Sequence, residues 1–208
     1  MVHYKLIYFS FRGRAEVPRQ LFALAGQDYE DVRYTLDEWP KHKDEMPFGQ
    51  MPVLEVDGKK LCQSRAIARF LAKRFVVADC HKFTGKGYAG KNALDEAVVD
   101  SIVDQCEDFF AEIRPYFRAA AGMEQGDVEN LEKHLLLPAR QKFFTFMTNF
   151  LRNNKSGYLV GDSLTWADLC VANFADLFNK VATLYDGFPE ELAKIAEHHQ
   201  QELESDVN

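Results

Sequence analysis

Residues 51–75 read Met51-Pro-Val-Leu-Glu-Val-Asp-Gly-Lys-Lys-Leu-Cys-Gln-Ser-Arg-Ala-Ile-Ala-Arg-Phe-Leu-Ala-Lys-Arg-Phe75. Pro52 to Val56 is a short apolar run, Asp57-Gly58 is a two-residue hairpin signal, and Lys59 to Cys62 is typical of the returning strand. Ser64 is a residue type preferred at helix N-caps, and apolar residues follow it at helical spacing. The stretch therefore predicts a β-hairpin that leads directly into a helix, and the free amides of that first helical turn suit an anion.

The bond between Met51 and Pro52 comes just before the first strand of this hairpin. Cis peptide bonds in folded proteins occur almost exclusively at X-Pro positions. A cis bond here would turn the Met51 backbone outward, where an extended ligand could pair with it as a further strand. We therefore predict a cis bond and a site that binds a peptide backbone.

The residues before the hairpin predict the rest of a small α/β domain. Residues 3–9 form a β-rich run, residues 14–25 form a helix that tolerates Pro18 near its first turn and ends at Gly26, and residues 29–34 form a second strand. The resulting order of strand, helix, strand, irregular segment, strand, strand and helix is the thioredoxin-like arrangement.

From about residue 87 the apolar residues recur only with the 3.6-residue period of helices. We therefore expect an α/β domain followed by an all-α domain. Their bounds are 1–76 for the thioredoxin-like domain, 77–86 for an extended linker and 87–208 for a helical bundle. Within the bundle, Thr165-Trp-Ala-Asp168 has the form of a capping box with Asp in place of the usual Glu.

Composition excludes several classes of function. The 208 residues carry a net charge of −7, which disfavours nucleic acid and anionic membranes as partners. The N-terminus has no apolar signal-peptide run, and no apolar segment has the length of a membrane span, so we expect a cytoplasmic protein. The four cysteines are too widely spaced for a compact metal site or a CxxC redox motif and are expected to be free thiols.

Several residues of the N-terminal half together resemble the glutathione-binding half of glutathione transferases. They are Tyr8, Arg14, Trp39, Lys43, Pro47-Phe-Gly-Gln-Met-Pro52 and Gln63-Ser64-Arg-Ala-Ile-Ala-Arg69. The most similar class is sigma, which includes nematode enzymes and the haematopoietic prostaglandin D synthases. The resemblance is dense over residues 2–75 and looser over 87–178.

This resemblance implies a detoxifying transferase that acts as a homodimer, with glutathione and a small apolar electrophile as substrates and with no further cofactor and no metal. It implies that Tyr8 and Arg14 are catalytic. The residues it implies for glutathione binding are Tyr8, Trp39, Lys43, Gly49, Gln50, Met51, Pro52, Gln63, Ser64 and Asp108 of the partner subunit.

The chemistry of a thiol explains the need for Tyr8 and Arg14. A free thiol has a pKa near 8.5, so only about 3% is thiolate at pH 7. A hydroxyl donor and a nearby cation would stabilise the thiolate, and lowering the pKa by about 2 requires roughly 2.7 kcal/mol. By pattern alone, a half-buried strand tyrosine and a surface arginine remain the simpler interpretation.

Trp39 and Lys43 lie four residues apart in a segment of alternating charges, so one helical turn would place them on one side. By resemblance they bind the glycine carboxylate of glutathione, whereas by pattern alone this segment is a solvated face.

Asp104, Glu107 and Asp108 share one side of a predicted helix. By resemblance Asp108 reaches the γ-glutamyl amino group across a dimer, and the alternatives are a polar helix face or a divalent-cation site.

The apolar pocket for the electrophile is the least defined part of the prediction. Its expected lining is Phe9, Phe11, Phe109, Phe110 and Ile113, although core packing is an alternative for any one of the 17 phenylalanines. Two alternative functions stay open: a non-catalytic binding protein for apolar ligands such as haem, and a glutathione-dependent prostaglandin isomerase.

Three further segments of the chain have unusual features. The insertion at 76–86 and the short C-terminus depart from the family pattern, and the segment from Gly85 to Gly90 fits G-x-G-x-x-G by letter. A dinucleotide site needs a buried strand directly before that motif, which the sequence lacks. We expect no nucleotide binding there.

Overall fold

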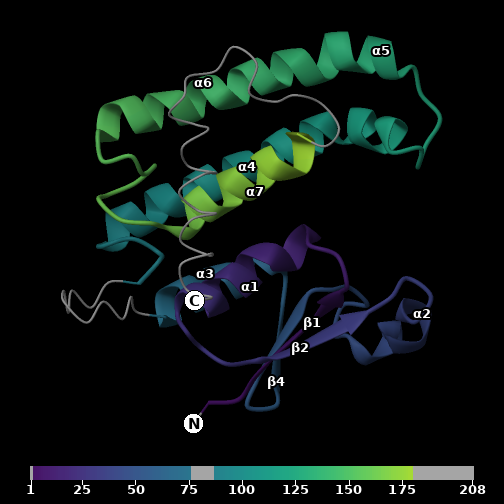
Figure 1. The fold of residues 1–208 in the computed structure, drawn as a ribbon, viewed down its shortest axis with the longest axis vertical. Helices are drawn as coiled ribbons and strands as arrows, with labels where there is room; N and C mark the ends of the chain where they lie inside the picture. The colour runs from purple at the N-terminus through teal and green to yellow at the C-terminus, as the bar shows by residue number, and fades with distance from the viewer. Residues whose placement is uncertain (1, 76–86, 180–208) are drawn as a thin grey trace. The chain divides into compact units, whose positions relative to one another are not determined.

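The computed structural model describes residues 2–75 and 87–179. These residues belong to two compact units, the first ending at Ala89 and the second beginning at Gly90 (Figure 1). The predicted linker at 77–86, the insertion and the C-terminal segment lie outside the described residues.

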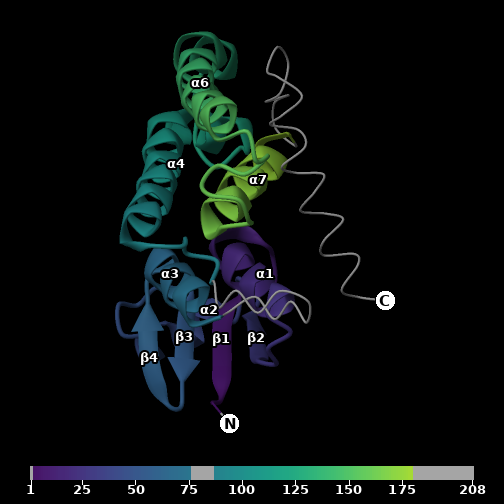
Figure 2. The same ribbon diagram turned by 90° about the vertical axis from the view of Figure 1, so that its left-hand side faces the viewer.

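The first unit contains a four-stranded mixed sheet with the order β2-β1-β3-β4. Strand β1 pairs parallel to β2 and antiparallel to β3, and β3 pairs antiparallel to β4 (Figure 2). The strands are β1 (Tyr4–Phe9), β2 (Glu30–Tyr34), β3 (Val53–Val56) and β4 (Lys59–Cys62). With its helices, this sheet confirms the thioredoxin-like arrangement.

Helices α1 (Glu16–Leu24) and α3 (Ser64–Arg74) pack against each other in this unit. Tyr4 of β1 makes edge contacts with Phe22 of α1 and with Phe75 just after α3, at ring-centroid distances of 5.4 and 5.8 Å. Alternate residues of a strand face the same side of a sheet. Tyr8, four residues after Tyr4, therefore points to the same face as Tyr4.

The opposite face of the sheet carries a second small core. Ile7, Met46 and Val53 are buried there, with Trp39 and Cys62 among the partly buried residues that pack on them. This core lies beneath the short helix α2 (Trp39–His42) and the 3₁₀ turn that follows it, Lys43–Glu45. The irregular segment between β2 and β3 is thus anchored to the sheet.

The predicted hairpin and the predicted cis bond are both confirmed. Val53 is paired with Cys62 across β3 and β4, and the turn residues Asp57 and Gly58 both have positive φ, as the type I′ hairpin turn requires. The bond between Met51 and Pro52 is cis. The hairpin therefore follows directly after Met51, whose backbone is predicted to pair with the ligand.

The second unit is helical, as predicted. Phe109 and Phe143 stack at its centre with ring centroids 4.6 Å apart. In the part of the chain that the structure describes, no helix is both long and apolar enough to cross a membrane. The helices of this unit are α4 (Ala93–Ala120), α5 (Val128–Leu131), a π-helical turn (Glu132–Leu136), α6 (Leu137–Asn154) and α7 (Trp166–Asn179).

The Asp168 half of the predicted capping box is present at the start of α7, whereas the Thr165 hydroxyl donates to Asp168 instead of accepting from its backbone N–H. The carboxylate of Asp168 accepts hydrogen bonds from the backbone N–H and the hydroxyl of Thr165, both at 2.8 Å, and from the backbone N–H of Leu159 at 2.8 Å. Asp168 is 1% exposed, and burial raises its pKa while these hydrogen bonds oppose the rise. The side chain ties the start of the helix to the preceding loop.

Candidate functional site

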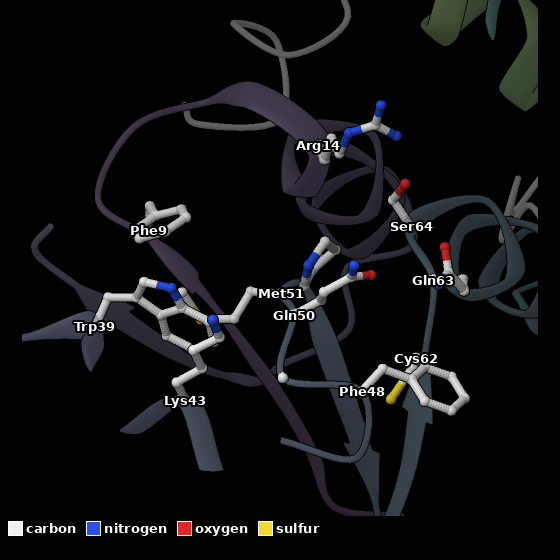
Figure 3. A pocket seen from close by; sticks show the side chains of 12 residues that line it. Phe9, Arg14, Trp39, Lys43, Phe48, Gln50, Met51, Cys62, Gln63 and Ser64 are labelled. Atoms are coloured by element: carbon white, nitrogen blue, oxygen red, sulfur yellow. The ribbon is translucent and has the colours of Figure 1, made fainter. Parts of the chain in front are cut away.

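The first unit contains a pocket of about 480 Å³. Its walls come from the end of β1, the 3₁₀ turn after it, α2, the segment before β3, and the junction of β4 with α3 (Figure 3). The lining residues are Phe9, Arg14, Trp39, Lys43, Phe48, Gly49, Gln50, Met51, Pro52, Cys62, Gln63 and Ser64. Nine of the residues implied by the family resemblance are thus brought together here: Arg14, Trp39, Lys43, Gly49, Gln50, Met51, Pro52, Gln63 and Ser64.

The pocket has two polar ends. Trp39 and Lys43 lie together on one side, and Gln63 and Ser64 lie on the other, with Gln50 and Met51 in between (Figure 3). The short helix α2 and the turn at Lys43 place the first pair on one side, as their spacing predicts. The site therefore suits an extended ligand with a polar group at each end.

Gly49 explains how Lys43 is held near the pocket wall. A Cβ atom at Gly49 would lie 3.5 Å from Cε of Lys43, so the lysine stem packs directly over the glycine. Gly49 has φ +57, a backbone conformation that favours glycine. The glycine thus provides both the turn and the space for the lysine stem.

The start of α3 differs from the prediction. Ser64 was expected at the N-cap, but Gln63 occupies that position and Ser64 is the first helical residue. Gln63 has φ 73 and ψ 115, a positive φ that non-glycine residues seldom adopt and that occurs at ligand-binding sites. The first turn of α3, whose leading amides have no acceptor within the helix itself, begins at Ser64, which lines the pocket.

Tyr8 lies next to the pocket, at the end of β1. Its side chain is 5% exposed, and its hydroxyl oxygen accepts a hydrogen bond from the backbone N–H of Arg14 at 3.1 Å. Because the oxygen acts as the acceptor in this bond, the hydroxyl proton stays available for donation to another group. Arg14, expected at the start of a helix, lies in the 3₁₀ turn Gly13–Ala15 that precedes α1.

The charge of the pocket lining is one-sided. Arg14 and Lys43 are cationic, and no Asp or Glu is among the twelve lining residues. The whole chain carries a net charge of −7, so the positive charge of this pocket is opposite in sign to that of the protein as a whole. Together with the start of α3, these charges favour an anionic ligand.

The predicted electrophile residues lie in different environments. Phe9 lines the pocket, and Phe11 is 50% exposed and stacks on Phe9 with ring centroids 5.0 Å apart. In the second unit Phe110 is half-buried, whereas Phe109 and Ile113 are 1% and 0% exposed. Phe109 and Ile113 therefore pack in the core of the helical unit, where they have almost no surface for a ligand.

The acidic cluster lies on α4. Asp104 and Asp108 are exposed and Glu107 is half-buried. Within residues 2–75 and 87–174, no group of three or more His, Cys, Asp or Glu side chains is placed to hold a metal ion.

Two residues of the pocket were not predicted from the sequence. Cys62 lines it from the end of β4, and burial raises the pKa of its thiol while Lys60 opposes the rise. Phe48 lines it with 64% of its surface exposed. The available signal for Cys62 was its position directly before Gln63, opposite Val53 in the predicted hairpin.

Comparison with known proteins identifies the two units separately. Residues 4–73 match the model described as Glutathione S-transferase, N-terminal domain. Residues 107–204 match the model described as Glutathione S-transferase, C-terminal domain. The first match contains every residue of the pocket.

Similar proteins extend over the whole chain. Probable glutathione S-transferase 7 of Caenorhabditis elegans is 48% identical, and the match covers 100% of this chain and 94% of that protein. A Nu-class GST from Haemonchus contortus is 58% identical, with a TM-score of 0.87 and coverage of 100% and 96%. Na-GST-3 of the hookworm Necator americanus, described as monomeric, is 57% identical, with a TM-score of 0.87 and coverage of 99% and 96%. The chain therefore belongs to the glutathione S-transferase family.

Proposed function

We propose that the pocket binds glutathione along its length and that Tyr8 holds the thiol as a thiolate for attack on an apolar electrophile. The observation that carries this proposal is a cationic pocket with a polar group at each end, next to a buried tyrosine hydroxyl. Glutathione has a carboxylate at each end and a thiol in the middle. The two polar ends of the pocket would thus receive the two carboxylates, and the Tyr8 hydroxyl would receive the thiol.

The two ends of the pocket would bind the two carboxylates. Lys43 and the indole N–H of Trp39 would bind the glycine carboxylate, and the amides at the start of α3 would bind the γ-glutamyl carboxylate. The Met51 backbone would pair with the middle of the peptide in the manner of an added strand. These contacts orient the sulfur.

Tyr8 and Arg14 would act on the sulfur itself. The hydroxyl of Tyr8 would donate to the thiolate, and the Arg14 side chain would add a positive charge nearby. The enzyme forms no covalent bond to the ligand in this scheme, because the activated nucleophile belongs to the cosubstrate. Rate enhancement comes from the larger thiolate fraction and from proximity.

The test is the ultraviolet absorbance of the thiolate of bound glutathione, titrated between about pH 5 and 9 in the wild type and in Tyr8→Phe. We expect the bound thiol to have a pKa below about 7 in the wild type and a higher pKa in the variant. Conjugation near pH 6.5 should fall at least about tenfold in the variant, while glutathione affinity changes by less than about threefold. An unchanged rate would remove Tyr8 from the mechanism.

A matched control is Tyr4→Phe. Tyr4 lies on the same strand and the same face of the sheet, is 2% exposed, and has its hydroxyl 3.5 Å from Nε of Arg74 rather than at the turn before α1. Loss of this hydroxyl should leave the pKa of the bound thiol unchanged. A rise in both variants would point to a general loss of packing.

The class and the assembly are parts of the same proposal. The sequence resemblance implies the sigma class, and we propose that class for this chain, although the Haemonchus contortus relative is described as Nu-class. A homodimer is proposed because the resemblance implies that Asp108 reaches the ligand across a subunit interface, although Na-GST-3 is described as monomeric. The relatives reported above are named as transferases and favour neither haem binding nor prostaglandin isomerisation.

A further inference from the structure

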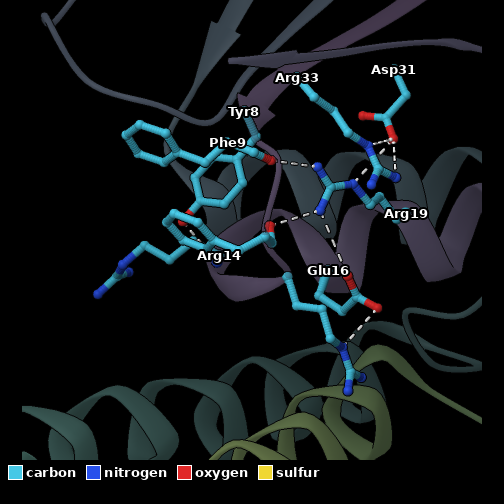
Figure 4. Close-up of polar contacts among 9 residues, drawn as sticks. Tyr8, Phe9, Arg14, Glu16, Arg19, Asp31 and Arg33 are labelled. Carbon is cyan, nitrogen blue, oxygen red and sulfur yellow. Dashed lines mark hydrogen bonds and ion pairs between the residues drawn. The ribbon is translucent and has the colours of Figure 1, made fainter. Parts of the chain in front are cut away.

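Arg19 is a buried arginine in α1 that does not line the pocket. It is 8% exposed, and arginine is seldom buried unless its charge is paired. Its Nη2 donates to the carbonyl oxygen of Phe9 at 3.0 Å, and its Nη1 donates to the carbonyl oxygen of Phe11 at 3.2 Å (Figure 4). One guanidinium thus binds two carbonyl groups of the segment that follows Tyr8.

These two carbonyl groups lie between the residues proposed to act on the sulfur. The segment leaves β1 at Phe9, passes Phe11, and reaches Arg14, whose backbone N–H returns to the Tyr8 hydroxyl at 3.1 Å. The Cζ atom of Arg19 also lies 5.9 Å from the centroid of the Tyr8 ring, within the range of a cation–π contact. Arg19 therefore contacts Tyr8 and both carbonyls of the loop that holds the Tyr8 hydroxyl.

The charge of Arg19 is balanced by two acids from different elements. Its Nη1 lies 3.7 Å from Glu16 in α1, and its Nε lies 3.3 Å from Asp31 in β2, as a charge contact without an aligned hydrogen bond. Asp31 is also held by Arg33, whose Nη2 lies 2.6 Å away. A buried arginine needs acidic partners to neutralise its charge, and Glu16 and Asp31 provide them. The two hydrogen bonds to the carbonyl groups of Phe9 and Phe11 are not needed for that neutralisation.

We propose that Arg19 is a positioning residue for the transferase reaction. Its two-pronged hydrogen bonding holds the loop from Phe9 to Arg14 so that the Tyr8 hydroxyl faces the sulfur of bound glutathione. This inference rests on the proposed function, in which that hydroxyl stabilises the thiolate. Arg19 itself touches neither substrate.

The geometry separates the role of the guanidinium from the role of its charge. A planar guanidinium presents several donors in fixed directions and can bind two carbonyl oxygens together, whereas a lysine ammonium is a single compact charge on a flexible stem. Arg19→Lys keeps the charge beside Asp31 and Tyr8 but loses the paired bonds to Phe9 and Phe11. Arg19→Met removes both.

The experiment measures the pKa of the thiol in bound glutathione, together with glutathione affinity, in the full-length protein. We expect Arg19→Lys and Arg19→Met each to raise this pKa by about 1, a tenfold loss of thiolate, with glutathione affinity within about threefold of the wild type. Arg33→Met is the matched control, because Arg33 pairs with the same Asp31, and none of the bonds drawn for it in Figure 4 reaches Tyr8 or the loop. It should leave the pKa unchanged.

Two outcomes would overturn the role of Arg19. A wild-type thiol pKa in folded Arg19→Lys would show that charge alone suffices, and an equal rise in Arg33→Met would show a general effect of disturbing Asp31. Should Arg19→Met fail to fold, as circular dichroism would reveal, Arg19→Lys still decides the question.

Tyr8→Phe, measured alongside, separates this inference from the proposed function. If Tyr8→Phe raises the pKa and Arg19→Lys does not, only the inference fails; if Tyr8→Phe has no effect, both fail. In the Tyr8→Phe background, Arg19→Lys should add no further rise, because the two residues act through one hydroxyl. An additive rise would mean that Arg19 acts independently of Tyr8.

Discussion

At the scale of single residues, the position of the Tyr8 hydroxyl depends on the absence of a side chain at Gly13. Gly13 has φ +56, and a Cβ atom there would lie 2.8 Å from the Tyr8 oxygen. Real Cβ atoms do not approach so closely, so either the hydroxyl or the turn would have to move. The glycine thus serves both the backbone conformation and the placement of a proposed catalytic group.

Gly13→Ala should therefore lower conjugation more than it lowers stability. We expect a rate loss of about tenfold or more, because small displacements of a reacting group reduce rates strongly. The free energy of unfolding should fall by about 1 kcal/mol, the usual cost of a non-glycine residue at positive φ. Steady-state kinetics and chemical denaturation measure the two quantities.

Gly26→Ala is the control for that variant. Gly26 has the same φ of +56, and a Cβ atom there would meet nothing within 4 Å. The loss of stability should be similar, with the rate unchanged. Equal rate losses in both variants would contradict the explanation through Tyr8.

At the scale of elements, the start of α3 combines a ligand-facing side chain with an unfavourable backbone conformation. Gln63 lines the pocket and has φ 73. The sequence pattern favoured Ser64 as the N-cap because serine caps helices well. The sequence pattern does not show how this helix follows the end of β4 in space. It therefore placed the N-cap at Ser64, one residue after its actual position at Gln63.

Two substitutions separate the side chain from the backbone at this position. Gln63→Gly and Gln63→Ala should weaken glutathione binding to a similar degree, because both remove the amide that lines the pocket. Gln63→Gly should be more stable than Gln63→Ala by about 1 kcal/mol, since glycine tolerates positive φ. Calorimetric titration and denaturation would show this, and equal stabilities would mean that the positive φ carries no cost.

The start of α7 depends on the buried carboxylate of Asp168. Asp168→Asn replaces one acceptor oxygen by a donor NH₂ group, so one of the three hydrogen bonds to Thr165 and Leu159 would face a second donor. We expect a loss of about 2 kcal/mol in the free energy of unfolding. The pKa of the thiol in bound glutathione should not change in this variant. A variant as stable as the wild type would contradict the structural role of Asp168.

The same carboxylate predicts a pH dependence of stability. Burial raises the pKa of Asp168 above its ordinary value of 3.8, so the folded state binds this proton more tightly than the unfolded chain does. Its contribution to stability therefore falls as the pH rises from 3.8 through the raised pKa. The stability advantage of the wild type over Asp168→Asn should shrink across that window, as denaturation at several pH values would show.

At the scale of the whole molecule, the proposed homodimer predicts that two copies together complete each glutathione site. Asp108 is exposed on α4, where it would be available to a partner. If the proposed homodimer forms, Asp108→Asn should weaken glutathione binding by about threefold or more, because a charged hydrogen bond to the ligand amine is lost. Calorimetric titration measures this affinity, and sedimentation measures the assembly.

Asp104→Asn is the control, since Asp104 is also exposed and lies one helical turn before Asp108. It should leave the affinity unchanged. A monomer with full glutathione affinity would contradict the dimer and would place this chain with Na-GST-3, which is described as monomeric.

The sequence by itself determined the elements and most of the pocket residues. Period-two and 3.6-residue patterns, turn residues such as Asp57-Gly58, and the capping box at Asp168 depend on neighbours close along the chain, so they can be interpreted locally. The family resemblance added Trp39, Lys43 and Gln63, which the structure brings into one pocket.

Only the tertiary structure decided which side chains meet across the fold. It placed Cys62 in the pocket opposite Val53, packed Phe109 in a core, and brought Arg19 within reach of Asp31 and of the loop after Tyr8. The sequence pattern around an apolar or charged residue is the same whether the residue lines a pocket, packs in a core or holds a loop in position. Its role depends on segments distant in sequence, and packing alone brings those together.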